Sequence, residues 1–322
     1  MRTETCWVVT DGKAGMESQC VGLAAALGLT PVIKRVALRA PWRQVTPYLR
    51  LFQRYAFAPE SDELLPPWPD LLIATGRNSV AASLYVREES RKAGRGTVTV
   101  QLQNPVISSD HFDLVVTPRH DRLDGVNVMS TKGALHRVNR HILAEGAEKL
   151  IGVVAALPRP YVGVLLGGSN AAYRLKPKRM KRLSEQLVAA ANRMKGSLLI
   201  TPSRRTDAEC LRILKAKAAE VPHYVWDGSG ENPYFGILGL ADFIVVTADS
   251  VNMVSEACAT GKPVYVTDLN GGSRKFRRFH RMMRKDGLTC AFEGTLEPFY
   301  YPPLDDMSAV AERVGMLLQT RH

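Results

Sequence analysis

The residues whose types and spacing best suit chemistry follow a short β-branched segment in the second half of the chain. Ser250, Asn252 and Met253 fall within one helical turn of one another. The free main-chain amides and the positive dipole end of such a turn favour a bound anion, for example a diphosphate. Glu256 comes about one and a half turns later, far enough to reach past phosphates to a sugar hydroxyl. This spacing predicts a site for a nucleoside diphosphate.

The elements that must position these residues are a strand, a helix and a second strand. Residues 243–246 (FIVV) form the β-branched segment of a strand buried on both faces, and residues 264–266 (VYV) form the next strand. Between them, Asp249 or Ser250 can cap a helix that runs to about Thr260. This order predicts a parallel βαβ unit, whose ligands bind at the carboxyl ends of its strands. An ordinary crossover with a well-capped helix explains the same residues, so both interpretations stay open here.

Length and charge indicate two domains and an anionic partner. The chain has 322 residues, more than one domain usually holds, and a net charge of +12. Nucleotide phosphates or an acidic membrane face could account for that charge. Nucleic acid is not expected as a partner, because no helix-turn-helix, zinc-finger or RNP-like pattern occurs. The five cysteines are scattered without a C-x-x-C pair, which indicates reduced thiols in the cytosol and no metal site.

We expect a cytoplasmic protein. No apolar segment approaches the ~20 residues that cross a bilayer, and the N-terminus lacks the apolar core and cleavage site of a signal peptide. The basic segment 274–285 (RKFRRFHRMMRK) would suit a peripheral contact with the anionic inner face of a membrane. The alternative is a helix that docks its apolar stripe on the domain and turns its arginines toward the ligand.

Polar turns recur where apolar segments end, as in a parallel sheet. In the first half these turns should gather along one edge, and they are DGKAG (11–15), TGRN (75–78), QNP (103–105) and TPRHD (117–121). In the second half, the apolar segment 161–166 ends in Gly168, Ser169 and Asn170, small residues that let phosphates approach the main chain. Residues 197–201 lead into Arg204 and Arg205 at a helix start.

These patterns predict an α/β protein of two Rossmann-like domains whose parallel sheets face each other across a cleft. We expect an N-terminal domain over residues 1–155 that takes the acceptor. A C-terminal domain over residues 156–304 would take a nucleotide-sugar donor. The last helix, in residues 305–322, is expected to pack back on the first domain. A short helix is also expected around residues 48–55.

Taken in order, the motifs resemble one family, the mitochondrial fission "elongated mitochondria" family. The segments that carry the resemblance cover nearly the whole chain; they are AGMESQ (14–19), ATGR (74–77), GALHRV (133–138), LLGGSN (165–170), TPSRRT (201–206), NPYFG through GKPVYV (232–266) and FRRFH (276–280). Many relatives carry His or another polar residue where Met16 stands, which argues against a catalytic role for position 16 here.

The resemblance implies a glycosyltransferase-B-like fold, and it identifies the family better than the activity. Members are sometimes labelled nucleoside-diphosphate-sugar epimerases. That label would need a tightly held nicotinamide cofactor, but the first βα turn lacks the G-x-G-x-x-G fingerprint and no Y-x-x-x-K pair occurs on a helix. The eukaryotic members act as recruiting factors in fission.

Two functions follow as hypotheses. The first is a metal-independent transferase with a nucleotide-diphosphate sugar as substrate and no tightly bound cofactor; the absence of a D-x-D motif favours metal independence. Its donor site would comprise Gly168, Ser169, Asn170, Ser250, Asn252 and Met253 around the diphosphate, Glu256 on the ribose, and Arg204 or Arg205 on the leaving group. Asp11, Glu17 and His136 are the candidate bases. The second hypothesis is a binding or recruiting protein that keeps the fold without turnover.

Overall fold

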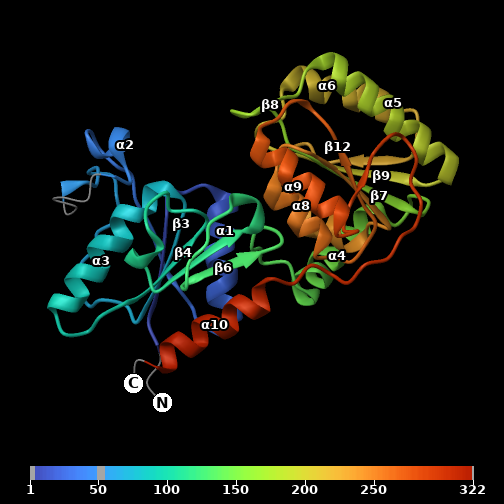
Figure 1. Ribbon diagram of the computed structural model, residues 1–322. Coiled ribbons are helices and arrows are strands. Elements are labelled where there is room, and N and C mark those ends of the chain that lie inside the picture. The colour runs from blue at the N-terminus through green and yellow to red at the C-terminus, as the bar shows by residue number, and fades with distance from the viewer. Residues whose placement is uncertain (1–3, 49–54, 321–322) are drawn as a thin grey trace. The chain divides into compact units, whose positions relative to one another are not determined.

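The computed structural model describes residues 4–48 and 55–320, which form two compact α/β units. The first unit comprises Met1–Arg137 with Asp305–His322, and the second comprises Val138–Leu304 (Figure 1). The helix expected around residues 48–55 falls mainly on residues 49–54, outside the described part of the chain.

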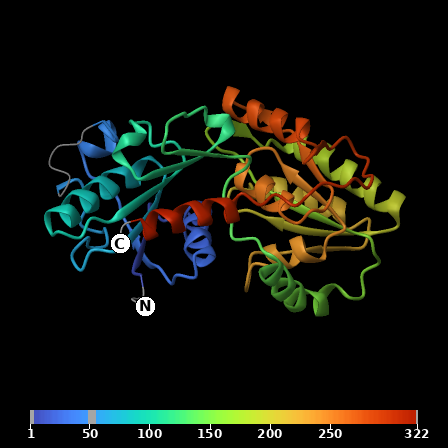
Figure 2. The same ribbon diagram turned by 60° about the horizontal axis from the view of Figure 1, so that its bottom comes forward.

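The first unit is built on one parallel sheet of six strands in the order β2-β1-β3-β4-β5-β6. Its central strands are buried along their whole length, as continuous apolar segments predict. The strands are β1 (Cys6–Thr10), β2 (Val32–Arg35), β3 (Leu71–Thr75), β4 (Val98–Leu102), β5 (Leu114–Pro118) and β6 (Val128–Thr131). The helices are α1 (Ala14–Ala26), α2 (Trp42–Val45), α3 (Val80–Lys92) and α10 (Met307–Gln319). The C-terminal helix α10 packs against α1 (Figure 2).

The second unit repeats this design with strand order β10-β9-β7-β11-β12-β14, all parallel. The strands are β7 (Tyr161–Leu166), β9 (Ser197–Pro202), β10 (His223–Val225), β11 (Phe243–Thr247), β12 (Val264–Thr267) and β14 (Cys290–Ala291). A small antiparallel pair adds β8 (Tyr173–Arg174) and β13 (Asn270–Gly271). The helices are α4 (Arg140–Val154), α5 (Pro177–Met194), α6 (Ala208–Ala218), α7 (Tyr234–Leu240), α8 (Val251–Cys258) and α9 (Arg274–Lys285). Figure 1 shows α5 and α6 on one face of this sheet and α8 and α9 on the other.

Helix α4 belongs to the second unit, which begins at Val138, whereas the sequence placed the domain boundary after residue 155. The reason is a glycine contact between α4 and α7. A Cβ atom on Gly146 would lie 2.7 Å from the main-chain nitrogen of Gly236, and one on Gly236 would lie 2.5 Å from the oxygen of Gly146. The two helix backbones therefore touch, and this contact anchors α4 to the later domain.

The fold class predicted from the sequence is confirmed. Both six-stranded sheets are parallel and doubly wound, which is the architecture of glycosyltransferase-B-like proteins. Each unit thus has one place where neighbouring strands lead away in opposite directions, and ligands of such sheets bind at the carboxyl ends there.

Candidate functional site

In the second unit, the strand order reverses between β7 and β11, which pair in parallel. Residues 167–170 follow β7, and residues 248–250 follow β11. We call these two segments the switch point. The sequence analysis singled out both segments, and the sheet topology brings them together.

A buried carboxylate ties the switch point together. Asp249 is only 2% exposed. Its Oδ2 accepts hydrogen bonds from the main-chain nitrogen of Gly168 at 3.0 Å and from Nη2 of Arg205 at 2.7 Å. Its main-chain oxygen accepts one from Nδ2 of Asn170 at 3.1 Å. One residue therefore joins the loops after β7, β9 and β11, and the Arg205 guanidinium compensates its charge.

Two glycines at the switch point have no room for a side chain. A Cβ atom on Gly167 would lie 2.2 Å from the carboxylate oxygens of Asp249, and one on Gly168 would lie 1.9 Å from the main-chain oxygen of Arg205. Real Cβ contacts of this kind are essentially never shorter than 3.0 Å. The close approach of the Asp249 carboxylate to Gly167, and of the Arg205 main chain to Gly168, explains the GG pair in the motif.

Helix α8 is capped by Ser250, one of the two residues expected to do so. Ser250 is the N-cap, and its Oγ accepts from the main-chain nitrogen of Met253 at 3.3 Å. Ser250 and Met253 therefore satisfy each other, so that amide is already used in this structure. The first turn of α8 also lies at the positive end of the helix dipole, which favours a bound anion.

Glu256 is partly buried and is held by a residue that the sequence analysis did not single out. Tyr234, at the start of α7, donates a hydrogen bond from its hydroxyl to Oε2 of Glu256 at 2.5 Å. Burial, followed by the negative charge of Glu256, raises the pKa of the Tyr234 phenol well above its ordinary value. The phenol thus stays protonated and orients the Glu256 carboxylate.

The other predicted donor residues serve the loops themselves or face solvent. Oδ1 of Asn170 accepts from the main-chain nitrogens of Ala172 and Tyr173, and Oγ of Ser169 accepts from that of Leu175. Arg204 is exposed and forms no ion pair with a described residue. Asp249 pairs with Arg205, so Arg204 is the arginine of this pair that Asp249 does not bind.

Helix α9 is docked on the second unit by its apolar stripe. Phe279 and Met283 are buried, and the ring of Phe276 meets Tyr173 edge-on with centroids 5.0 Å apart. This is the alternative that the sequence analysis gave for segment 274–285. Most of the basic side chains of α9 are exposed on its other faces.

His280 on α9 supports the switch point, a role that the sequence did not reveal. The residue is 4% exposed, and its Nε2 lies 2.8 Å from the main-chain oxygen of Ala248, next to Asp249. Burial lowers the pKa of His280, so the ring is neutral near pH 7 and Nε2–H donates to that oxygen. The FRRFH segment signalled importance, but its spacing could not show the contact with the β11–α8 loop.

In the first unit, the strand order reverses between β1 and β3, and Asp11 lies at that edge. Its side chain is 12% exposed and pairs with Lys13. Nδ2 of Asn78, in the turn after β3, donates to Oδ2 of Asp11 at 3.2 Å, whereas Oδ1 is buried with no hydrogen-bond partner among the described residues. Gly12 and Gly76 flank this arrangement with φ of +78° each, which only glycine adopts freely.

The other two candidate bases differ in their surroundings. Glu17 receives two hydrogen bonds of 3.0 Å from Nε and Nη2 of Arg35, and this pairing raises the pKa of the guanidinium. His136 is 5% exposed, and its main-chain oxygen packs beside Gly22. Nδ1 of His136 is also buried without a hydrogen-bond partner among the described residues. Of the three candidates, Asp11 is the one that directly follows a strand where the strand order reverses.

Two searches of the described residues concern metals and membranes. Residues 4–48 and 55–320 contain no group of three or more His, Cys, Asp or Glu side chains arranged to hold a metal ion. None of the helices within these ranges combines the length and apolarity that crossing a membrane requires.

Solved structures share the fold of the whole chain. UDP-GlcNAc 2-epimerase from Neisseria meningitidis, bound to UDP-GlcNAc, superposes with a TM-score of 0.54 over 98% of this chain and 100% of that one, at 12% identity. MurG from Acinetobacter baumannii superposes with a TM-score of 0.51 over 99% and 91%, at 13% identity. At these identities the likeness concerns the fold.

Two relatives found by sequence have higher identities to this chain than these solved structures do. The Arabidopsis thaliana "Mitochondrial fission protein ELM1" is 33% identical over 280 residues, covering 79% of this chain and 65% of that protein, so the match spans just under two thirds of its length. The "Uncharacterized protein RP120" of Rickettsia prowazekii is 25% identical over 357 residues, covering 97% of this chain and 98% of that protein. The family described as "Mitochondrial fission ELM1" matches residues 14–318. The chain therefore belongs to the mitochondrial fission ELM1 family.

Proposed function

We propose that this protein binds a nucleoside-diphosphate sugar at the switch point of its second unit and transfers the sugar to an acceptor without a metal ion. The observation that carries the proposal is the Asp249 arrangement. A buried carboxylate paired with Arg205, and two glycines without room for Cβ, hold the main chain of the β7 loop beside the start of α8. Such an arrangement presents main-chain amides to phosphates at fixed positions.

These contacts indicate which residues would bind the diphosphate and the ribose of the nucleotide sugar. The amide of Gly168 is held by Asp249 and that of Met253 by Ser250, so the amides of Ser169 and Val251 are the ones assigned to the diphosphate. Glu256, oriented by Tyr234, is assigned to the ribose hydroxyls. Arg204 is assigned to the leaving diphosphate, because Arg205 already neutralises Asp249.

The fold neighbours supply the chemical class of the ligand. The Neisseria epimerase holds UDP-GlcNAc, and a Methanocaldococcus jannaschii UDP-GlcNAc 2-epimerase holds UDP-GlcNAc and UDP, with a TM-score of 0.51 to this chain. A nucleotide sugar is thus a ligand that this fold accommodates. Since these neighbours are epimerases, an assay must follow conversion of the sugar as well as its transfer.

The acceptor is assigned to the first unit, with Asp11 as the general base. Its buried Oδ1 lacks a hydrogen-bond partner among the described residues, so it can accept the proton of an incoming hydroxyl. The side-chain amide of Asn78 fixes the carboxylate through Oδ2. Such a base would act on an alcohol rather than on an acidic group, because a neighbouring anion would be repelled.

The alternative is a binding or recruiting protein without turnover; the name of the Arabidopsis relative refers to mitochondrial fission and to no enzymatic activity. The two functions give different results in one experiment. The purified protein is mixed with UDP-, GDP-, ADP- and dTDP-sugars, and thermal shift is measured before release of nucleoside diphosphate. Binding followed by turnover supports an enzyme, and binding alone supports a recruiting protein. Absence of any binding would contradict the proposed site.

Replacing Glu256 by alanine is expected to weaken nucleotide binding by about 1.5–3 kcal/mol, the usual scale for hydrogen bonds to a charged group. The fold should be kept, because the carboxylate contributes little to the apolar core. Titration calorimetry with the nucleotide that binds best measures the effect. Glu185→Ala is the control, since Glu185 is an exposed residue of α5. Equal affinity in both variants would remove Glu256 from the site.

Peripheral membrane contact remains a prediction for α9. Seven basic residues lie in this helix of 12 residues, and no acidic residue does. Since Phe276 and Phe279 already pack within the unit, association would depend on charge alone, at about 1 kcal/mol per residue near the lipid. We expect sedimentation with anionic liposomes at low salt that is lost at high salt and when Arg277, Arg278 and Arg281 become Gln.

The matched control removes the same charge from another helix, by replacing Arg212, Lys215 and Lys217 of α6 with Gln. If both triple variants lose sedimentation equally, net charge rather than α9 is responsible. If the wild type stays in the supernatant at low salt, α9 has no membrane role of this kind.

A further inference from the structure

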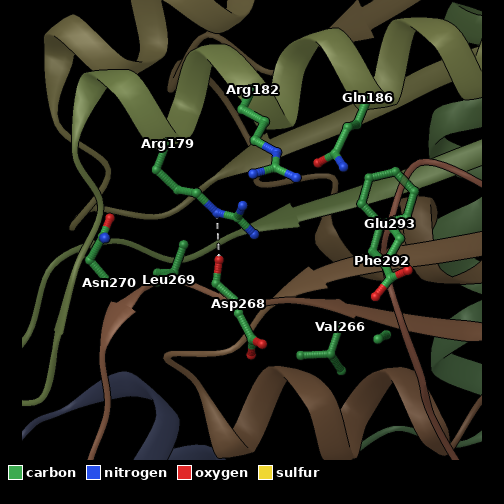
Figure 3. A pocket seen from close by; sticks show the side chains of 10 residues that line it. Arg179, Arg182, Gln186, Val266, Asp268, Leu269, Asn270, Phe292 and Glu293 are labelled. Atoms are coloured by element: carbon green, nitrogen blue, oxygen red, sulfur yellow. Dashed lines mark hydrogen bonds between the residues drawn. The ribbon is translucent and has the colours of Figure 1, made fainter.

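A cavity of about 580 Å³ opens on the α5 face of the second sheet, away from α8. One wall is α5, and the other is the end of β12 with the segment after β14 (Figure 3). The lining residues are Arg179, Arg182, Gln186, Val266, Asp268, Leu269, Asn270, Ala291, Phe292 and Glu293. None of them belongs to the switch point. The volume is typical of a small-molecule site.

Two guanidinium groups face this cavity from successive turns of α5. Arg179 is fixed, because its Nε donates to the main-chain oxygen of Asp268 at 2.7 Å and its Nη2 donates to Oγ1 of Thr267 at 3.1 Å. Arg182 forms no hydrogen bond or ion pair with a described residue. Figure 3 shows both groups pointing from α5 toward the opposite wall.

The two acids nearby form no direct ion pair with these guanidiniums, although the charge of Asp268 acts on Arg179 from a distance. Neither Asp268 nor Glu293 forms an ion pair with Arg179 or Arg182 among the described residues. Burial is the main cause that lowers the pKa of Arg179, the neighbouring charge of Arg182 lowers it further, and Asp268 opposes the shift. An anionic group between the two guanidiniums would relieve this repulsion and accept hydrogen bonds from both.

The rest of the cavity suits a ring with hydroxyl groups. Oε1 of Gln186 is buried and accepts no hydrogen bond from a described residue. A ligand hydroxyl could therefore donate a hydrogen bond to this oxygen. The Glu293 carboxylate is exposed on the opposite wall and also accepts hydrogen bonds. Val266 and Phe292, buried at 5% and 4% exposure, give an apolar surface between these polar groups. Alternating polar and apolar surface is what a sugar ring presents.

We propose that this cavity is a second ligand site, which binds a phosphorylated sugar with its phosphate on Arg179 and Arg182 and its hydroxyls on Gln186 and Glu293. The site lies on the opposite face of the sheet from α8 and does not depend on the proposed transferase activity. It touches the end of β12, because Arg179 donates to the main-chain oxygen of Asp268 and to Oγ1 of Thr267. Strand β12 pairs with β11, which leads into the switch point.

The test uses titration calorimetry of the full-length protein with glucose 6-phosphate, N-acetylglucosamine 1-phosphate and inorganic phosphate. We expect at least one sugar phosphate to bind. Arg182→Gln should weaken that binding by about tenfold or more, the effect of losing a charge-assisted hydrogen bond. Gln186→Leu should weaken sugar phosphate but not inorganic phosphate. Lys181→Gln is the matched control, because Lys181 is an exposed neighbour on α5 that does not line the cavity.

A further variant separates this site from the proposed donor site. Glu256→Ala should leave sugar-phosphate binding unchanged, whereas a loss there would place the ligand at the switch point and overturn the proposal. Absence of binding, or equal binding by wild type and Arg182→Gln, would also overturn it. Inorganic phosphate that binds as tightly as the sugar phosphates would refute the sugar part. Circular dichroism and thermal unfolding confirm that each variant is folded.

Discussion

A Gly168→Ala variant is expected to bind nucleotide sugars at least about 100-fold more weakly than the wild type. The added Cβ would lie 1.9 Å from the main-chain oxygen of Arg205, and that atom belongs to backbone, which cannot rotate away. The β7 and β9 loops must therefore separate by more than an ångström. A shift of that size at a site of main-chain contacts costs about two orders of magnitude. Titration calorimetry with the best nucleotide ligand measures it.

Gly152→Ala is the matched control for this substitution. Gly152 lies in α4, and nothing approaches within 4 Å of its added Cβ. Alanine in such a helix position should stabilise the protein by about 0.5–1 kcal/mol and leave ligand affinity unchanged. If Gly168→Ala binds nucleotide as well as Gly152→Ala does, the GG pair is a packing feature and the phosphates lie elsewhere.

Periodicity predicted the framework of the fold because each strand is a continuous buried apolar segment. The segment 243–246 and the strand β11 agree to within a residue, and so do 161–166 and β7. The place of α4 could not be predicted in this way. Its assignment depends on Gly146 meeting Gly236, a contact between residues 90 positions apart that no local pattern encodes.

The parts of the candidate site that directly follow a strand could be predicted from the sequence. The contacts between side chains of different loops and helices could not. The segments after β7 and β11 were found as small-residue turns. Asp249 was considered only as a helix cap, because its bonds to Gly168 and Arg205 arise from sheet order rather than from spacing. His280 and Tyr234 were missed for the same reason, since each contacts its partner from another helix.

Replacing Asp249 by alanine is expected to destabilise the protein by about 3 kcal/mol, the largest stability effect that we predict for a single polar residue here. The substitution removes the acceptor of the Gly168 amide and the partner of Arg205 at one time. The side chain of Asp249 is 0% exposed, so water cannot replace the lost contacts. Urea unfolding followed by circular dichroism measures the change in the free energy of unfolding.

A second ion pair of the same length tests whether burial is the cause. Lys217 and Glu220 lie 2.7 Å apart, as Arg205 and Asp249 do, but their side chains are 34% and 52% exposed. Glu220→Ala should therefore cost no more than about 0.5 kcal/mol. Arg205→Ala should cost about 1–2 kcal/mol, less than Asp249→Ala, because Arg205 is itself 42% exposed. If Asp249→Ala and Glu220→Ala unfold at the same urea concentration, Asp249 does not hold the three loops together, and the basis of the proposed donor site is lost with it.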